Sequence, residues 1–382
     1  MKSHYSRFFA AAPERLHFAA HSHHPWPDVT RDAQIAAWDD AARLADLKWG
    51  RVFDSIAAEA QAHIARVLDL PEAKQIAFAP NTHEFVIRLL SCFPPGRKLK
   101  VVTTDSEFLS FSRQIARLEE EHLVTVVRVP AEPFSSFPAR FIEAASEPDN
   151  DLVFFSQVFF NSGFVVREVE AIVNAAAPAA MVVIDGYHAF FAVPFSLRKV
   201  ADRAFFLAGG YKYAQSGEGV CFLSVPRGFE GRPLNTGWFA GFGSLEGGLL
   251  DRVPFSNDGF RLMGATFDPV GLYRFNAVAR LFDSRGITIA TVDDHVKTLQ
   301  RLFLDLLGRK KGAALAAEDL IAPGDGVSGL GHFLTFRRTD AATIAERLAA
   351  RNVIVDHRGD RLRFGFGMYH DAADVEALLT HL

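Results

Sequence analysis

The sequence predicts an α/β protein: a large domain with a mostly parallel sheet between helices, followed by a small α+β domain. Short, β-branched apolar runs such as MVVID (181–185) and AFFLAGG (204–210) indicate strands that are buried on both faces. The helical stretch at 165–177 lies between the runs at 151–163 and 181–185, which is the pattern of a strand–helix–strand unit. A length of 382 residues suits a large domain plus a smaller one. We expect an N-terminal arm at 1–30 that is part of the small domain, a large domain at 31–255 and the rest of the small domain at 256–382.

The elements follow in order along the chain. Residues 30–70 are predicted to be mostly helical, ending at Pro71. A short strand then runs into Asn81-Thr82, where a helix begins, and a further strand covers 99–105. The run at 219–226 is predicted to be another strand. After about residue 331 the pattern changes to strand, helix, two strands and a closing helix that begins at Asp371.

Composition excludes several classes of protein. The formal net charge is −4, and no stretch is dense in Lys or Arg, so nucleic acid is not an expected partner. The N-terminal apolar patch is too short for a secretory signal, and no apolar run is long enough to span a membrane. Cys92 and Cys221 form no disulfide or metal pattern, which suits a reducing cytoplasm. The 36 phenylalanines indicate aromatic-packed cores or a large subunit interface.

Chemically useful side chains follow two of the predicted strands. Asp185 and His188 come at the end of one strand, and Lys212 follows the glycine turn of the next. Ligands of open α/β sheets bind at such strand ends. A lysine there can form a Schiff base with an aldehyde cofactor, and a buried aspartate can keep the ring nitrogen of pyridoxal phosphate (PLP) protonated. Alone, such an aspartate would be a turn residue and such a lysine a surface charge. Together they predict a PLP site.

The same segments carry a family resemblance. Asp185-Gly-Tyr-His188 is similar to the D-x-x-H motif, and Tyr211-Lys212-Tyr213 to the Y-K-Y segment, of the class V aminotransferase group of fold-type I PLP enzymes. Within that group the chain resembles kynureninase most, over most of its length. The resemblance implies a seven-stranded sheet, PLP as cofactor, Lys212 and Asp185 as catalytic residues, and His188 hydrogen-bonded to Asp185.

Further site residues are implied by the resemblance. The PLP phosphate is expected at Thr82 and His83, where a helix N-terminus would also favour an anion, although ordinary N-capping explains the Asn-Thr pair equally well. Tyr211 of the same chain is also expected at the phosphate, and the resemblance implies that Trp238 reaches the phosphate of the neighbouring subunit, so the active site is expected to be shared within a homodimer. Phe108 is expected over the cofactor ring.

The substrate side is implied in the same way. Arg363 is expected to grip the α-carboxylate of an amino-acid substrate, because a forked guanidinium suits a carboxylate. Ser22 and His23 are candidates for substrate contact. Two positions depart from kynureninase: Phe111 stands where the family has an acidic residue, and Gly264 where it has an asparagine.

The resemblance therefore predicts kynureninase-like hydrolysis of a Cβ–Cγ bond, giving alanine and an anthranilate-type acid. A class V aminotransferase with an unknown amino donor is the alternative. Cysteine desulfuration is disfavoured because it needs a mobile cysteine late in the chain, and the last one is Cys221, nine residues after Lys212. A catalytically silent PLP-binding relative also stays open. A metal-dependent hydrolase that uses His21, His23 and His24 is disfavoured by their spacing, and no metal is expected.

Overall fold

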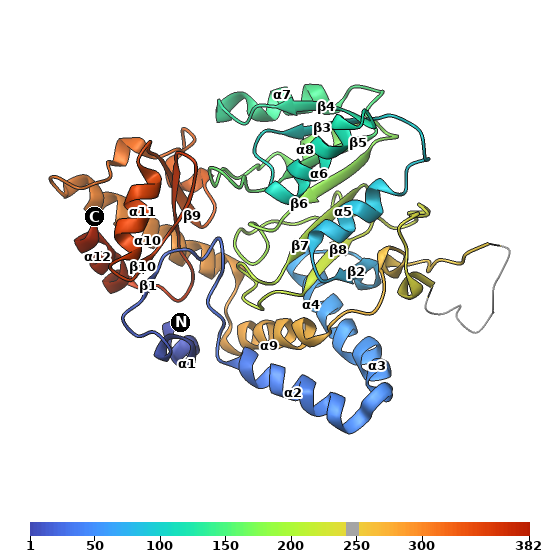
Figure 1. Cartoon of the computed structure of the whole chain (residues 1–382), viewed down its shortest axis with the longest axis horizontal. Helices are drawn as coiled ribbons and strands as arrows, with labels where there is room; N and C mark the ends of the chain where they lie inside the picture. Colours follow the sequence, from blue (N-terminus) through green and yellow to red (C-terminus); the bar gives the residue numbers. More distant parts are fainter. Residues whose placement is uncertain (242–251) are drawn as a thin grey trace.

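The computed structural model describes residues 1–241 and 252–382 and contains a large domain and a small domain (Figure 1). Seven strands form the large sheet, in the order β2-β8-β7-β6-β5-β3-β4. They are β2 (Ile76–Ala79), β3 (Leu99–Thr104), β4 (Val124–Val129), β5 (Leu152–Ser156), β6 (Met181–Asp185), β7 (Ala204–Gly209) and β8 (Cys221–Ser224). Only β8 runs antiparallel to its neighbours among these strands. The predicted fold class, a mostly parallel seven-stranded sheet between helices, is confirmed.

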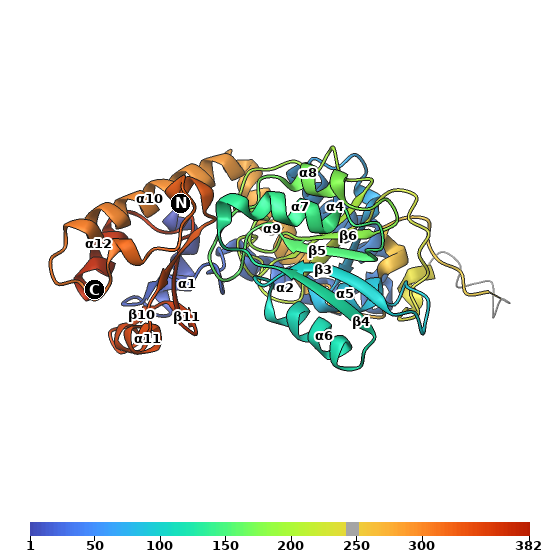
Figure 2. The ribbon, with the colours of Figure 1, turned by 90° about the horizontal axis from the view of Figure 1, so that it is seen from above.

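Helices cover both faces of this sheet. In Figure 2, α7 (Phe137–Ala145) and α8 (Val169–Ala175) lie on one side of β3 and β5, and α6 (Leu109–Glu120) lies on the other. Strands β5 and β7 are buried from end to end, as the apolar runs predict. The abundant phenylalanines pack in this core: for example, the rings of Phe111 and Phe154 stack with centroids 3.5 Å apart.

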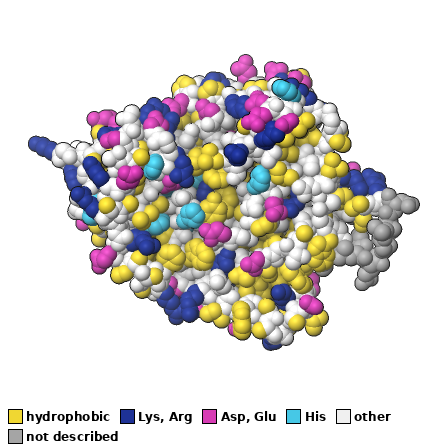
Figure 3. All heavy atoms as spheres, in the orientation of Figure 1, with side chains coloured by type: hydrophobic (Ala, Val, Ile, Leu, Met, Phe, Trp, Pro, Cys, Tyr) yellow, Lys and Arg dark blue, Asp and Glu magenta, His cyan; other side chains and the backbone are white. Residues whose placement is uncertain are grey.

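The N-terminal helices lead into the large domain. They are η1 (Lys2–Tyr5), α1 (Ser6–Ala10), α2 (Val29–Leu44), η2 (Ala45–Leu47), α3 (Lys48–Arg51), η3 (Val52–Ala57) and α4 (Ala58–Leu68). Shorter helical turns are η4 (Ala73–Gln75), η5 (Phe134–Ser136), η7 (Gly259–Leu262), η8 (Ala317–Asp319) and η9 (Gly326–Gly329). Hydrophobic side chains gather on the lower part of the face shown in Figure 3. Exposed large ones on α2 and η2 include Ile35, Trp38 and Leu47.

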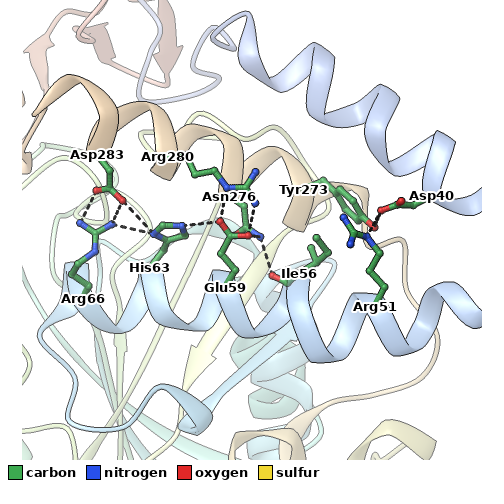
Figure 4. Close-up of polar contacts among 10 residues, drawn as sticks. All are labelled: Asp40, Arg51, Ile56, Glu59, His63, Arg66, Tyr273, Asn276, Arg280 and Asp283. Carbon is green, nitrogen blue, oxygen red and sulfur yellow. Dashed lines mark hydrogen bonds and ion pairs between the residues drawn. The ribbon is translucent and has the colours of Figure 1, made fainter.

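Helix α9 (Val270–Arg285) packs on α2 and α4 and leads to the small domain. Polar contacts line this packing (Figure 4): Glu59 pairs with Arg280, and Arg66 pairs with Asp283 at 2.8 Å. The buried Asn276 donates to the carbonyl of Ile56 at 2.9 Å. Ion pairs at the surface contribute little to the free energy of unfolding, whereas a buried amide without a hydrogen-bond partner would lower it. The buried apolar side chains of α9 belong to the core of the large sheet.

The small domain has its own core. It contains α10 (Ile289–Arg309), β9 (Phe333–Arg337), α11 (Ala341–Ala349), β10 (Val353–Ile354), β11 (Asp356–Arg358), β12 (Arg361–Gly365) and α12 (Ala372–His381). Strands β11, β12 and β9 form an antiparallel sheet. The predicted strand over 352–358 is divided, because β10 pairs instead with β1 (Leu16–His17) of the N-terminal arm. Phe18 from this arm lies in the small-domain core.

The turn after β6 leaves no room for a side chain at Gly186. A Cβ there would lie 1.8 Å from Cζ of Phe206 on the neighbouring strand. The Phe206 ring is fully buried and packs on Phe195 and Phe222, so it has nowhere to move. We expect Gly186→Ala to lower the free energy of unfolding by about 1–3 kcal/mol, measured by urea denaturation.

Gly308 of α10 provides the matched control. Nothing lies within 4 Å of a Cβ at this position, so Gly308→Ala is expected to raise the free energy of unfolding by up to about 1 kcal/mol through helix propensity. Equal free energies of unfolding for the two variants would show that the contact with Phe206 does not exclude a side chain at position 186.

No helix in the described part of the chain is long and apolar enough to cross a membrane.

Candidate active site

A cavity of about 270 Å³ opens where β5, β6 and β7 end. Side chains from these strand ends, from the start of helix α5 (Thr82–Leu90) and from the loop before α6 line it. The lining residues are Pro80, Asn81, Thr82, His83, Phe108, Ser110, Ser156, Phe160, Asp185, Tyr187, His188, Tyr211, Lys212, Glu218, Gly219 and Cys221. Lys212 and Asp185 thus share one cavity, and seven of the residues predicted to bind the cofactor line it.

Lys212 is the central charged group of this cavity. It is 5% exposed, and burial lowers the pKa of its amine to about 7, although the charge of Asp185 acts in the opposite direction. Asp185 accepts a hydrogen bond from the backbone N–H of Tyr187 at 2.9 Å, and burial raises the pKa of its carboxyl. A lysine with a pKa near 7 can accept and return protons at neutral pH.

Aromatic rings surround the lysine amine. Its Nζ lies 5.3 Å from the ring centroid of Phe108, 5.0 Å from Tyr187 and 5.7 Å from Tyr211. Ring faces attract a cation, so these contacts partly compensate the ammonium for its lost water. The three rings also give the cavity flat apolar walls, which suit a planar aromatic ligand.

His188 takes a different partner from the predicted one. The sequence predicts a hydrogen bond to Asp185, but Nε2 of His188 lies 2.9 Å from Nζ of Lys212 and 3.2 Å from the carbonyl oxygen of His21. The tight turn after β6, closed by Ala189 N–H donating to the Gly186 carbonyl at 2.9 Å, directs the ring toward the lysine. Burial and the Lys212 charge hold the pKa of His188 well below 6.5, so the ring is neutral.

The start of α5 forms another wall of the cavity. Asn81 caps the helix by accepting the backbone N–H of Glu84 at 3.0 Å, and Thr82 and His83 in the first turn line the cavity. Nδ1 of His83 is buried without a hydrogen-bond partner among the described residues. A helix N-terminus and an unpaired imidazole nitrogen fit an anion such as a phosphate. Together with Lys212, Asp185 and the aromatic walls, they fit PLP.

Arg363 lies behind the cavity wall. Its guanidinium forms an ion pair with Asp356, donates to the Phe160 carbonyl at 2.7 Å and lies 4.6 Å from the centre of the Phe160 ring. Arg363 is 1% exposed and, unlike Phe160, does not line the cavity. The pair with Asp356 could not be predicted from one strand alone, because it crosses the β11–β12 hairpin.

The N-terminal arm reaches the rim of the cavity. The ring of His23 lies 5.4 Å from that of Tyr211, and its Nε2 lies 3.7 Å from the carboxylate of Glu218. Ser22 contacts His23 at 3.3 Å. His21 and His24 are buried instead, and no group of three or more His, Cys, Asp or Glu side chains in the described ranges is arranged to hold a metal ion.

Trp238 lies outside this cavity. Its indole N–H donates to the hydroxyl of Thr266 at 3.2 Å, and its ring packs on Phe239. The expected contact with the phosphate of a neighbouring subunit stays a prediction.

Several lining residues were missed at the sequence level. Ser156, Tyr187, Glu218 and Cys221 line the cavity, and Glu107 lies directly behind Ser156. Ser156 is the last residue of a buried strand, the position that also pointed to Asp185, so the same signal was present. For Glu107 the only signal was its place beside Phe108.

Comparison with known proteins identifies the family. The model of the family described as aminotransferase class-V matches residues 41–378. A search of curated proteins finds no match. Among solved structures, the cystine C–S lyase C-DES, in complex with its product cysteine persulfide, matches with a TM-score of 0.81 and 16% identity, covering 98% of each chain. The cysteine desulfurase CsdA from Escherichia coli matches with a TM-score of 0.76 and 16% identity, covering 99% of this chain and 96% of its own.

These matches correct the predicted function. The kynureninase-like assignment is wrong, because the matched structures are a C–S lyase and cysteine desulfurases. Chemistry at the sulfur of a cysteine-derived substrate, which includes the cysteine desulfuration that was ranked low, is what these matches point to. The aminotransferase alternative finds no support in them either. The residues behind the assignment, Asp185, His188 and Lys212, carry the resemblance to the family as a whole and were not matched to a particular substrate side chain. The two departures do not line the cavity: Phe111 stacks on Phe154 in the core, and Gly264 lies against the side chain of Arg88.

The family match over most of the chain and a cavity whose residues fit the cofactor lead to one conclusion. The chain belongs to the class V aminotransferase family and is a fold-type I PLP-dependent enzyme.

Proposed function

We propose that this enzyme is a C–S lyase, which cleaves the Cβ–S bond of a cysteine-derived amino acid by elimination. One observation carries the proposal: the cavity joins a buried lysine with a pKa of about 7 to Asp185, and the cysteine that lines it is not a nucleophile. The fold likeness to the C–S lyase C-DES and to cysteine desulfurases supports chemistry at sulfur.

The state of the thiols separates elimination from sulfur transfer to the protein. Cys221 is 3% exposed, its Sγ lies 3.3 Å from the Tyr187 hydroxyl, and burial raises the pKa of its thiol to about 12. Cys92 does not line the cavity, and burial raises its pKa to about 12 as well. Only about one thiol in 10⁵ with such a pKa is ionised at pH 7, and the thiolate is the nucleophile. In a disulfide substrate such as L-cystine, the sulfur leaves with the other half of the substrate, so no protein thiol is needed to accept it.

The hairpin that carries Arg363 contains no cysteine that could accept sulfur. Strands β11 and β12 form a tight hairpin at Gly359, and no residue from 356 to 365 is a cysteine. Asp356 in this hairpin is fixed by Arg358, at 2.8 Å, and by Arg363. This hairpin therefore offers no sulfur acceptor.

The residues of the cavity divide the work as follows. Bound PLP would supply an electron sink for the bonds to the substrate α-carbon. Thr82 and His83 would hold its phosphate, Asp185 would keep its ring nitrogen protonated, and Phe108 would lie against its ring. Lys212, once its amine is free, takes the α-proton as general base. His188, neutral and with its Nε2 2.9 Å from the amine, orients the amine through this hydrogen bond.

The overall reaction balances with water alone. The α-proton leaves to Lys212 and the Cβ–S bond breaks, with the electron pair departing on sulfur. For L-cystine the products after hydrolysis are pyruvate, ammonia and cysteine persulfide. Since no electrons are gained or lost overall, no external oxidant or reductant is needed.

The α-carboxylate of the substrate is assigned to Arg363. Its Nε is buried without a hydrogen-bond partner among the described residues, and its guanidinium lies 4.6 Å from the centre of the Phe160 ring, which lines the cavity. Reaching a substrate requires the Phe160 ring to turn aside. Ser22 and His23 at the rim are assigned to the distal end of the substrate, next to Glu218.

A homodimer with a shared active site completes the proposal. The exposed apolar side chains of α2, together with Trp238 at 42% exposure, favour a subunit interface.

The test is a product assay on the PLP-loaded enzyme. With L-cystine we expect pyruvate and persulfide in equal amounts, measured by lactate dehydrogenase coupling and cyanolysis. The variant Cys92→Ser/Cys221→Ser is expected to retain this activity within about threefold, because neither thiol is ionised at neutral pH.

Two outcomes would contradict the proposal. Failure to release pyruvate from L-cystine or any S-substituted cysteine would exclude elimination at sulfur. Release of alanine from L-cysteine, lost in the Cys221→Ser variant, would instead identify a desulfurase that uses a protein thiol.

A further inference from the structure

Glu107 is a buried carboxyl group behind the wall of the active site. It is 4% exposed and lies in the loop between β3 and α6. Its Oε1 accepts the hydroxyl of Thr104 at 2.6 Å and the backbone N–H of Ser156 at 3.1 Å, while its Oε2 accepts the hydroxyl of Ser156 at 2.5 Å. Such a group costs free energy to bury unless its hydrogen bonds are satisfied, and here they are.

These bonds join parts of the chain that are far apart in sequence. Thr104 ends β3 and Ser156 ends β5, its neighbour in the sheet. Phe108, the next residue, lines the cavity and lies 5.3 Å from the Lys212 amine. Glu107 therefore fixes the loop that carries Phe108 to the strand end that carries Ser156.

Glu107 also determines the direction in which the hydroxyl proton of Ser156 points. When Glu107 is ionised, both of its oxygens accept, so the Ser156 hydroxyl donates to Oε2 and its lone pairs are left for the cavity. Ser156 stands opposite Asp185 on the adjacent strand, and both line the cavity. An amide at position 107 would donate to Ser156 through its NH₂ group and turn the hydroxyl proton toward the cavity.

Two carboxyl groups therefore lie near each other here: Asp185 lines the cavity, and Glu107 lies behind Ser156. Burial raises the pKa of Glu107 to about 7, and the charge of Asp185 acts in the same direction.

We propose that Glu107 is a positioning residue for the cofactor ring: it holds Phe108 against the cavity and makes Ser156 a hydrogen-bond acceptor beside Asp185. Neither role requires contact between Glu107 and the cofactor. The proposal rests on PLP binding and not on the identity of the substrate.

The test measures cofactor binding rather than turnover. Apo protein is titrated with PLP, and the absorbance band of the bound cofactor is followed from pH 6 to pH 10. We expect Glu107→Ala to raise the dissociation constant of PLP about tenfold or more, because Phe108 and Ser156 lose their anchor. We expect Glu107→Gln to bind within about threefold of wild type, because its shape is kept, but to shift the pH midpoint of the band, because the Ser156 proton is reversed.

Asp151 supplies the matched control. It is a buried carboxylate before the start of β5, at the other end of that strand, where it accepts from Arg97 and from the backbone N–H of Lys100. Asp151→Asn is expected to destabilise the protein while leaving PLP affinity and the band midpoint unchanged. Wild-type PLP affinity in Glu107→Ala, or an unshifted midpoint in Glu107→Gln, would overturn the proposal and leave Glu107 a purely structural residue. Failure of the C–S cleavage assay would not change either readout.

Discussion

Replacing Lys212 by alanine is expected to lower kcat for C–S cleavage by about 10⁴-fold or more, since the variant has no base for the α-proton. The amine is buried, has a pKa of about 7 and shares its cavity with Asp185, so no solvent molecule is equivalently placed. The same change should abolish the covalent link to the cofactor. Borohydride treatment of the wild-type enzyme should attach the pyridoxyl group to the peptide that contains Lys212, and mass spectrometry should find no such attachment in the variant.

Lys199 is the control for this experiment. It is an exposed lysine paired with Glu170 at 3.0 Å, so Lys199→Ala should keep both turnover and cofactor attachment. Attachment of the pyridoxyl group to any other lysine in wild-type protein, or turnover in Lys212→Ala within tenfold of wild type, would remove Lys212 from its proposed role.

The strand ends were predictable because local sequence determines them. A run such as MVVID must be buried on both faces, and the residue that follows it must then lie at the edge of the sheet. Asp185, Lys212 and the start of α5 were found in this way. The same rule reaches Ser156, which ends a run of the same kind.

Contacts between distant segments could not be predicted in this way. Glu107 meets Ser156 from 49 positions away, and His188 meets Lys212 from 24 positions away. Whether a buried carboxyl or imidazole turns to one neighbour or another depends on side-chain packing that no single strand encodes. The substrate could not be predicted for a related reason. The motif residues are those of the family and not of one substrate, and the pair of Arg363 with Asp356 forms only in the folded hairpin.

Buried histidines make the fold sensitive to acid, and this is the second large effect we expect. Six of them in the described part of the chain, His17, His21, His24, His188, His332 and His370, have pKa values lowered by burial, to about 4 for His17 and about 3 for His21 and His24. In the unfolded chain each would bind a proton near pH 6.5, which the folded chain resists. The folded state is therefore fully favoured above pH 6.5 and loses stability as the pH falls below that value.

The size of the effect follows from linkage. Each such histidine costs at most about 1.4 kcal/mol per pH unit below 6.5. Lys212 and Lys297 act in the same direction, because burial lowers their pKa values to about 7 and about 8. Glu107 acts in the opposite direction, because its pKa is raised and its folded form binds a proton first; it offsets about 2 kcal/mol. We expect the unfolding free energy of the apo protein to fall by several kcal/mol between pH 7.5 and 5.5, as measured by urea denaturation. Typical domains have only 5–15 kcal/mol in total.

His370 allows the cause to be tested directly. Its Nε2 donates to the carbonyl of His17 at 2.8 Å, and its Nδ1 accepts the backbone N–H of Gly367 at 3.0 Å, so a second ring proton would break the latter bond. His370→Gln removes the titrating group and should make the pH dependence shallower by about 1.4 kcal/mol per pH unit. The exposed His122, changed to Asn, should leave the slope as it is. Constant stability between pH 7.5 and 5.5, or a wild-type slope in His370→Gln, would show that the buried imidazoles are not the acid-sensitive groups. Carboxyl groups that titrate below pH 5 would then have to account for any acid unfolding.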